Sequence, residues 1–315
     1  MDNYEAHLES RRGPLPSASL VTEAPSLPDA AREEDGPVQQ FRRAAAEDPV
    51  LVQRLRGRAS IVTGSGCNIV ALATDDGVLL VDSGLVGAKV AAAVANVSGK
   101  PIHQVINTHW HFDHTDGNEW MHARGAAVIA HENTRRHLSV DTRVEDWFHF
   151  TFPASPAGAL PSTVITGERT VQLNGSAAVV NAYTPAHTDS DISVHLVDPD
   201  VLCVGDTWWN GVYPFIDYAT GGSIGGMIRA AEESLSRASA DTIIVAGHGA
   251  PGSTRDLVKF KDMLTVIRDR VAVLKAQGLT ADEVVAAKPT ADFDAAWGGW
   301  LIGPDFFARL VYKGV

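Results

Sequence analysis

Cysteine is scarce in this chain, whose 315 residues include only Cys67 and Cys203. Each lies in an apolar run typical of a β-strand, where a cysteine most often packs as a small buried hydrophobe. A disulfide between them stays an open alternative, because the sequence does not give the distance between the two residues. Long hydrophobic runs are also absent: no stretch of about 18 apolar residues occurs, so we expect no membrane-spanning helix.

Basic residues are few relative to acidic ones, with 26 Lys and Arg against 38 Asp and Glu and a net charge of −12. Nucleic-acid phosphates require clustered Lys and Arg, so we expect a small-molecule substrate and no nucleic-acid partner. The oligomeric state stays open. Near the N-terminus, Arg11-Arg12 is followed by Gly13-Pro14 instead of an apolar stretch. We therefore expect no secretory signal and a cytoplasmic protein.

The first part of the chain has little apolar periodicity. Residues 1–36 are rich in Pro, Ser, Ala and acidic residues, which predicts an extended or disordered arm. Helices are predicted at 38–46 and 49–56, the second because Asp48-Pro49 is typical of a cap followed by proline in the first turn. Residues 139–162 combine aromatic residues with prolines, and we expect a loop that either overhangs the functional site or packs on the core.

The most informative segment is residues 109–114, which read His-Trp-His-Phe-Asp-His. Two histidines separated by one residue, His109 and His111, point the same way on an extended segment. Both imidazoles can then reach one metal ion at about 2.0–2.1 Å. Asp113 and His114 follow at once, and their side chains diverge from the first pair after a turn. This geometry favours two adjacent metal ions over one.

Three further candidate ligands follow at the junctions between predicted strands and loops: His187, Asp206 and His248. Asp206 comes at the end of a strand of the buried type, where a carboxylate must be paired or coordinate a metal ion. His248 lies between two glycines, which permit close approach of the backbone. These positions suggest that distant segments converge on the hexapeptide.

With H-x-H-x-D-H at 109–114, then a lone His, a lone Asp and Gly-His in that order, the chain resembles the metallo-β-lactamase superfamily over roughly residues 60–250. The resemblance implies a four-layer α/β/β/α sandwich with the metals at one edge between the sheets. The ligand set that it implies is His109, His111 and His187 for the first metal, Asp113, His114 and His248 for the second, and Asp206 bridging both. In the best-known lactamase subclass a cysteine stands at the place of Asp206, so the glyoxalase II-like and lactonase-like branches are the better match.

The resemblance also suggests how the chain is divided. We expect the metallo-β-lactamase-fold catalytic domain to span 37–279 and a helical, aromatic extension at 280–315 to pack on it. A weak duplication, in which an apolar strand ends at an Asp turn at both Asp82 and Asp206, fits two half-units that meet at one sheet edge. In that arrangement we expect Asp82 to orient a metal ligand or the backbone through hydrogen bonds. The alternative is that Asp82 is a simple turn residue at the end of its strand.

Five imidazoles, two carboxylates and no thiolate favour zinc, two ions per chain, with iron or manganese as alternatives. We therefore hypothesise a dinuclear zinc hydrolase, in which a metal-bridging hydroxide opens the carbonyl of a lactam, lactone or thioester. Asp113 is the expected catalytic residue, because it would both bind the second metal and orient the hydroxide. The alternative is a mononuclear iron persulfide dioxygenase-like oxidoreductase on the same scaffold.

Substrate choice is expected to depend on the aromatic, glycine-rich loop after Asp206. Four of its side chains either wall an apolar pocket or fill the core: Trp208, Trp209, Tyr213 and Phe215. No Lys or Arg occurs between Asp206 and Arg229, whereas the best-known zinc β-lactamases place a lysine soon after this ligand. The glutathione-binding C-terminal domain of glyoxalase II is also not recognisable in 250–315.

Overall fold

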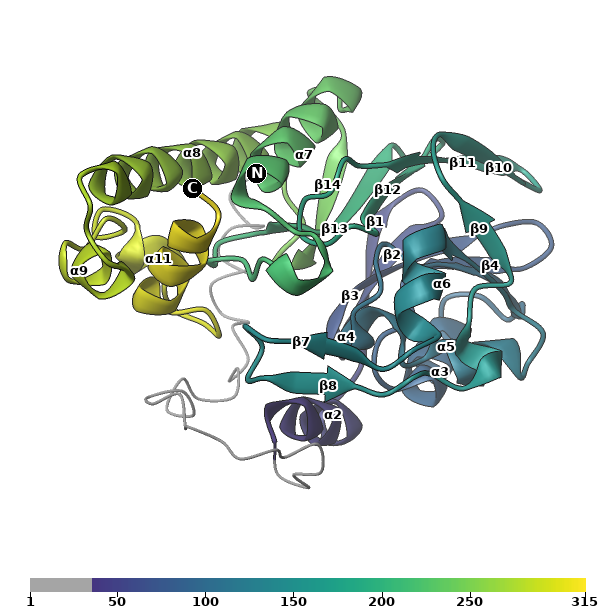
Figure 1. Ribbon diagram of the computed structural model, residues 1–315. Helices are drawn as coiled ribbons and strands as arrows, with labels where there is room; N and C mark the ends of the chain where they lie inside the picture. The colour runs from purple at the N-terminus through teal and green to yellow at the C-terminus, as the bar shows by residue number, and fades with distance from the viewer. Residues whose placement is uncertain (1–35) are drawn as a thin grey trace.

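Two β-sheets packed face to face form the centre of the computed structural model, and helices cover their outer faces (Figure 1). The structure describes residues 36–315. The arm predicted at 1–36 therefore lies outside the described residues, except for Gly36. The arrangement is the α/β/β/α sandwich that the resemblance implied. No helix within 36–315 has the length and apolar character needed to cross a membrane.

The first sheet has seven strands, whose spatial order is β1 (Leu51–Arg56), β2 (Ala59–Ser65), β3 (Cys67–Ala73), β4 (Val78–Val81), β5 (Ile102–Ile106), β6 (Ala127–His131) and β9 (Thr163–Ile165). Pairing is antiparallel from β1 to β4 and parallel from β4 to β9. Parallel neighbours need crossover connections. These contain α3 (Gly87–Ala95), α4 (Phe112–Thr115), α5 (Asn118–His122) and α6 (Glu132–Leu138).

The second sheet has five strands, in the order β10 (Arg169–Leu173), β11 (Ser176–Ala182), β12 (Ile192–Leu196), β13 (Val201–Trp209) and β14 (Ile243–His248). Only its last pair, β13 and β14, is parallel. The crossover between them is α7 (Ile224–Arg237), preceded by the short turn η3 (Tyr218–Thr220). Helix α8 (Thr254–Ala276) packs against α7 on the outer face of this sheet. The C-terminal helices α9 (Ala281–Ala286), α10 (Asp294–Trp297) and α11 (Pro304–Lys313) follow.

Strict alternation of side chains along the central strands creates separate hydrophobic cores. In β3, Val70 and Leu72 face the second sheet, whereas Ile69 and Ala71 face the layer of α3 and α5. Strand β13 does the same, since Cys203 lies between the sheets and Val204 lies on the side of α7 and α8. Strands buried on both faces read as continuous apolar runs, which is why the sequence shows them so clearly.

The helix predicted at 38–46 is confirmed as α2 (Pro37–Glu47), but the helix predicted at 49–56 is wrong. Residues 51–56 form β1, which pairs antiparallel with β2. The Asp48-Pro49 step ends a helix instead of starting one, because proline disfavours the helical conformation in the residue before it. Asp48 is accordingly extended, with φ −62° and ψ 144°.

The segment 139–162 also has more regular structure than expected. It contains a hairpin of β7 (Thr142–Val144) and β8 (Phe150–Phe152), followed by the short turn η2 (Ala157–Ala159). The connecting turn places Phe148 and His149 at φ +52° and +53°. Bulky residues rarely adopt this left-handed conformation, so the usual glycine or asparagine signal of a hairpin is missing from the sequence. In Figure 1 the hairpin lies near α2 and α4.

Candidate metal centre

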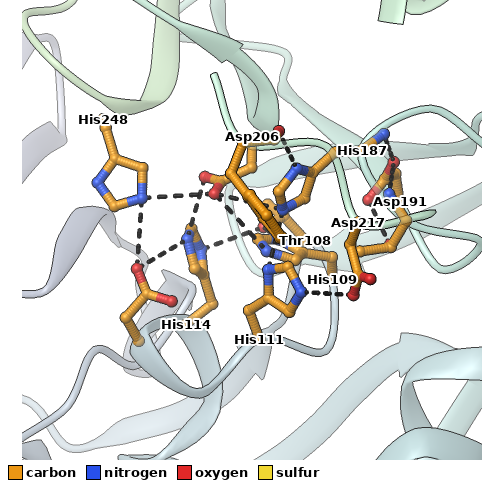
Figure 2. Close-up of polar contacts among 12 residues, drawn as sticks. Thr108, His109, His111, His114, His187, Asp191, Asp206, Asp217 and His248 are labelled. Atoms are coloured by element: carbon orange, nitrogen blue, oxygen red, sulfur yellow. Dashed lines mark hydrogen bonds and ion pairs between the residues drawn. The ribbon is translucent and has the colours of Figure 1, made fainter. Parts of the chain in front are cut away.

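The ends of several strands and one turn deliver the seven predicted ligands to one edge of the sandwich. His109, His111 and the start of α4 follow β5, while Asp206 lies within β13 and His248 ends β14. His187 belongs to the turn between β11 and β12. Figure 2 shows the labelled histidines arranged around Asp206. The structure therefore brings together segments that are up to about a hundred and forty residues apart in the sequence.

The side chains form two groups of potential metal ligands. In the first, one atom from each of His109, His111, His187 and Asp206 lies within 4.8 Å of the others. In the second, the same holds for Asp113, His114 and His248. All are buried except Asp113, whose side chain is 14% exposed. These are the two groups that the resemblance implied.

Asp206 lies between the two groups. Its Oδ1 is 3.1 Å from Nε2 of His114, and its Oδ2 is 3.4 Å from Nε2 of His248. Oδ2 is also 3.5 Å from Nε2 of His187 and 3.9 Å from Nε2 of His109. One carboxylate thus faces histidines of both groups, which is the position a bridging ligand needs.

Hydrogen bonds behind the site decide which nitrogen each ring turns toward it. Nε2 of His111 lies 3.0 Å from Oδ2 of Asp217, and Nδ1 of His187 lies 2.9 Å from the carbonyl oxygen of Phe215. Each of these nitrogens faces an acceptor and must carry the proton when the ring is neutral. The remaining nitrogens, Nδ1 of His111 and Nε2 of His187, are then both bare and only 2.9 Å apart. Two lone pairs at this distance repel unless a cation or a proton lies between them.

Unpartnered polar atoms provide a second test of whether these residues fit a metal. Among the described residues, Nε2 of His109, Nε2 of His114 and Oδ1 of Asp206 are buried and make no hydrogen bond of good geometry, although the last two lie 3.1 Å apart. Leaving a buried polar group unsatisfied costs about 1–3 kcal/mol. Metal coordination would satisfy all three atoms, so the donor set fits divalent metal ions of the zinc type.

Burial and mutual charge set the protonation of the ligands. Burial lowers the pKa of His109 well below its usual range and that of His187 to about 4, so both rings are in the neutral form that binds metal. Burial alone would raise the pKa of Asp206, but His248 and His114 outweigh it and hold this pKa well below the ordinary value. Conversely, Asp206 and Asp113 overcome burial and raise the pKa of His248 to about 9. The negative charges of Asp206 and Asp113 therefore favour a cation between the ligand side chains.

Asp82 occupies the supporting position proposed from the duplication. Its Oδ2 lies 2.9 Å from Nδ1 of His114, while the backbone N–H and hydroxyl of Thr108 donate to its two oxygens at 2.7 and 2.8 Å. Cys67 lies beside this pair, but burial raises the pKa of its thiol to about 12 and keeps it protonated. Both Cys67 and Cys203 are free.

Sequence reasoning missed two further supporting carboxylates. Asp217, which faces His111, also accepts a hydrogen bond from the Thr220 hydroxyl at 2.6 Å. Asp191 accepts from the backbone N–H of His187 at 2.7 Å and of Thr188 at 2.9 Å, and so holds the turn that carries His187. A carboxylate four residues after His187 is a usable local signal, whereas no local pattern connects Asp217 with a histidine 106 positions away.

A cleft that is partly open to solvent lies at the candidate metal centre, and its empty space, open solvent included, amounts to about 530 Å³. Its floor includes His111, Asp113 and His248, and its walls are mostly aromatic. Val144, Trp147 and Phe152 of the hairpin in 139–162 line the cavity and also belong to the buried core, so this segment combines the two alternatives expected from the sequence. Sequence reasoning did not anticipate the walls from α2 and from the C-terminal segment, which are Phe41, Trp300 and Leu301.

The four aromatic residues expected in the pocket separate into two pairs. Trp209 and Phe215 line the cavity. Trp208 and Tyr213 do not, because both are fully buried in the core. Tyr213 stacks on Phe307 with ring centroids 4.5 Å apart, and its hydroxyl donates to Oδ1 of Asp294 at 2.9 Å. These contacts with the C-terminal segment could not be read from the sequence.

Known proteins share parts of this sequence and fold. A hydroxyacylglutathione hydrolase from Polaromonas sp. is 31% identical over 159 residues, which cover 50% of this chain and 52% of that protein. Another, from Rhodospirillum rubrum, is 26% identical over 200 residues, covering 63% of this chain and 66% of that protein. The chain thus spans about half to two thirds of the length of these relatives.

Two solved structures show the fold. A metallo-β-lactamase from Pontibacter korlensis superposes with a TM-score of 0.58 at 18% identity, covering 69% of this chain and 99% of that one. The sec-alkylsulfatase Pisa1 from Pseudomonas sp. gives a TM-score of 0.63 at 17% identity, covering 88% and 51%. A family model described as the metallo-beta-lactamase superfamily matches residues 62–248, a range that contains all seven candidate ligands. This match extends over more than half of the chain, which therefore belongs to the metallo-β-lactamase superfamily.

Proposed function

We propose that this protein is a dinuclear zinc-dependent hydrolase that cleaves the acyl bond of a lactam, lactone or thioester. The observation that carries the proposal is the position of Asp206, within 3.1 Å of His114 and within 3.5 Å of His187. One carboxylate shared by two preassembled ligand groups is suited to a pair of adjacent ions. The sequence relatives named hydroxyacylglutathione hydrolase support a hydrolase and favour a thioester among the candidate substrates.

The proposed reaction is hydrolysis without a protein nucleophile. When bound, two zinc ions would acidify a water molecule and polarise the substrate carbonyl. The water oxygen forms a bond to the carbonyl carbon, the bond from that carbon to nitrogen, oxygen or sulfur breaks, and the departing atom takes up the water proton. The products are a carboxylic acid and an amine, alcohol or thiol.

Within this proposal the residues of the chain have separate tasks. His109, His111 and His187 hold the first metal, and Asp113, His114 and His248 hold the second. Asp113 also lines the cavity, and its Oδ2 lies 3.3 Å from Nε2 of His248. It is thus placed both to bind the second metal and to orient the attacking water toward the substrate. Asp82 and Asp217 keep the rings of His114 and His111 turned toward the metals.

The test is a metal count on the purified protein combined with hydrolysis assays. The substrates are a chromogenic cephalosporin, an acyl-homoserine lactone and a lactoyl-thioester. We expect two zinc ions per chain and turnover of at least one of these compounds. A single iron per chain, with oxidation of a persulfide, would replace the proposal by the dioxygenase alternative. Full activity in metal-free protein would overturn both.

A further inference from the structure

The cavity above the metal centre is walled by apolar side chains from separate parts of the chain. Besides Phe112 of α4 and Phe215 of the loop after β13, they come from four parts, namely α2, the β7–β8 hairpin, the end of β13 and the segment between α10 and α11, and include Phe41, Trp147, Phe152, Trp209, Trp300 and Leu301. The polar side chains at this cavity are those of the candidate metal ligands. A substrate would therefore meet polar groups at its reacting end and hydrocarbon elsewhere.

No lysine or arginine from the described part of the chain lines the cavity. Arg42 comes near, with its guanidinium 5.6 Å from the ring centroid of the wall residue Phe112, but its Nε donates to Oδ2 of Asp116 at 2.7 Å. Two carboxylates, Asp113 and Asp206, contribute to the same cavity. A substrate carboxylate bound away from the metals would find no cationic side chain among these walls and would lie near two carboxylates, which is strongly unfavourable.

The apolar walls are held in place by contacts among themselves. Phe41 stacks on Trp147, with centroids 6.3 Å apart and an interplanar angle of 29°. On the opposite side, Trp300 lies 5.3 Å from Trp209 and 5.2 Å from the ring of His248. The wall segments also touch through an ion pair of 2.6 Å between Lys313 of α11 and Asp146 of the hairpin. A pocket built in this way is preformed for a ligand of matching apolar character.

We infer that the substrate is an uncharged ester, lactone or thioester with an apolar acyl chain, and that Trp147 and Trp300 determine this specificity. The inference rests on the proposed hydrolase function and narrows its substrate class. Compounds that carry a carboxylate remote from the scissile bond, such as glutathione thioesters, are expected to be poor substrates. The acyl chain lies between the two tryptophans, while the carbonyl faces Asp113 and His248.

The decisive comparison uses zinc-loaded wild-type protein and two sets of esters. Along the p-nitrophenyl series from acetate to octanoate, kcat/KM should rise by roughly fourfold for each methylene that becomes buried. p-Nitrophenyl hexanoate is matched by mono-p-nitrophenyl adipate, which ends in a carboxylate instead of a methyl group. We expect the neutral ester to be preferred by about thirtyfold or more, given the cost of an unpaired buried charge. Equal rates on this pair, or no dependence on chain length, would overturn the inference.

Substitutions of Trp147 and Trp300 test whether these two side chains cause the dependence of kcat/KM on chain length. Trp300→Ala should lower the ratio of kcat/KM on octanoate to kcat/KM on acetate by about tenfold, because only the long chain reaches that wall. Trp147→Ala should behave in the same way, and Trp147→Leu, which keeps an apolar side chain, should recover part of the loss. Trp297→Ala is the matched control, since Trp297 ends α10 three residues before Trp300, packs against Phe260 and does not line the cavity.

Binding of a neutral probe separates this inference from the proposed function. N-phenyl-1-naphthylamine, an uncharged fluorescent compound, should bind the zinc-loaded wild-type protein and the Trp297→Ala variant equally. It should bind the Trp300→Ala variant at least about fivefold more weakly. Binding with this pattern but without turnover of any ester would refute the hydrolase function and keep the apolar pocket. Ester turnover with no probe binding and no chain-length effect would refute the apolar pocket and keep the hydrolase.

Discussion

Oδ2 of Asp82 accepts a hydrogen bond from Nδ1 of His114 at 2.9 Å, and this contact leaves Nε2 of His114 facing Asp206. Asp82 also binds the backbone N–H of Thr108 at 2.7 Å, so one carboxylate orients both a ligand ring and the start of the loop that carries the histidines. Its backbone lies in the left-handed region, at φ +66°. Asparagine tolerates this conformation as aspartate does, which makes Asp82→Asn a clean test of the charge.

The first prediction is that Asp82→Asn weakens binding of one metal ion by about 10–100-fold, because a partner behind a ligating histidine both orients the ring and raises its basicity. The affected ion is the one held by Asp113, His114 and His248. A stepwise zinc titration against a competing chelator measures it. Two unchanged dissociation constants would show that Asp82 has no role in metal binding.

The matched variant is Asp217→Asn, since Asp217 stands behind His111 as Asp82 stands behind His114. We expect it to weaken the other metal ion, held by His109, His111 and His187, by a similar factor of about 10–100. The two variants serve as controls for each other in the same titration. Loss of the same ion in both would contradict the assignment of separate ligand groups.

The second prediction concerns the proposed catalytic role of Asp113. Asp113→Ala should lower kcat by about a hundredfold while KM changes by less than about threefold, because misplacing the attacking water affects the rate more than substrate binding. Steady-state kinetics with a metal count on the same sample measure both effects.

A nearby carboxylate controls for the general loss of negative charge. Asp116→Asn alters a residue three positions along the chain, whose carboxylate is paired with Arg42. We expect its kcat within about twofold of the wild type, in line with the small effect of most substitutions away from a functional feature. Full turnover in Asp113→Ala with two metals bound would remove Asp113 from the mechanism.

The candidate ligands that the structure brings together were accessible from the sequence because they combine specific residue types with strand ends. His109 and His111 alternate on an extended segment, and Asp206 ends a run that is apolar on both faces. Such features are local, so a single sequence displays them. The layer order followed from the family resemblance, and the separate hydrophobic cores agree with it.

The pocket walls were less accessible because tertiary packing decides them. Phe41 and Trp300 stand far from every ligand in the sequence, and their positions depend on how α2 and the C-terminal segment dock. Trp208 and Trp209 are neighbours on one strand and necessarily point to opposite faces. Both belong to the buried core, and composition could not show that Trp209 also lines the cavity whereas Trp208 does not.

The third prediction tests whether zinc binding requires the close contact between β13 and β14 at the candidate metal centre. A Cβ atom added at Gly247 would lie 1.8 Å from Oδ1 of Asp206 and 2.9 Å from the backbone carbon of Gly205. Gly247→Ala must therefore displace the carboxylate of Asp206, which we propose to bridge the metals, or strand β14. We expect at least about tenfold weaker binding of both metals, because Asp206 serves both groups.

The control for this substitution is Gly99→Ala, where an added Cβ meets no atom within 4 Å. Zinc titration of the two variants, with circular dichroism to check folding, gives the comparison. Gly99→Ala should bind zinc as the wild type does. Normal affinity in a folded Gly247→Ala variant would mean that Asp206 can move without loss, and would contradict its bridging role.

The last prediction separates structural from substrate-binding aromatic residues in the loop after Asp206. Tyr213 is fully buried, stacks on Phe307 and donates its hydroxyl to Asp294, so its contacts join this loop to the C-terminal extension. Tyr213→Phe keeps the stacked ring and removes one hydrogen bond, which should lower the free energy of unfolding by about 1 kcal/mol. Tyr213→Ala also removes the ring, and the loss should rise to about 3–5 kcal/mol.

Urea denaturation measures both values, and kcat/KM of Tyr213→Phe should stay within about twofold of the wild type. Reduced kcat/KM at unchanged stability would instead place Tyr213 in contact with the substrate.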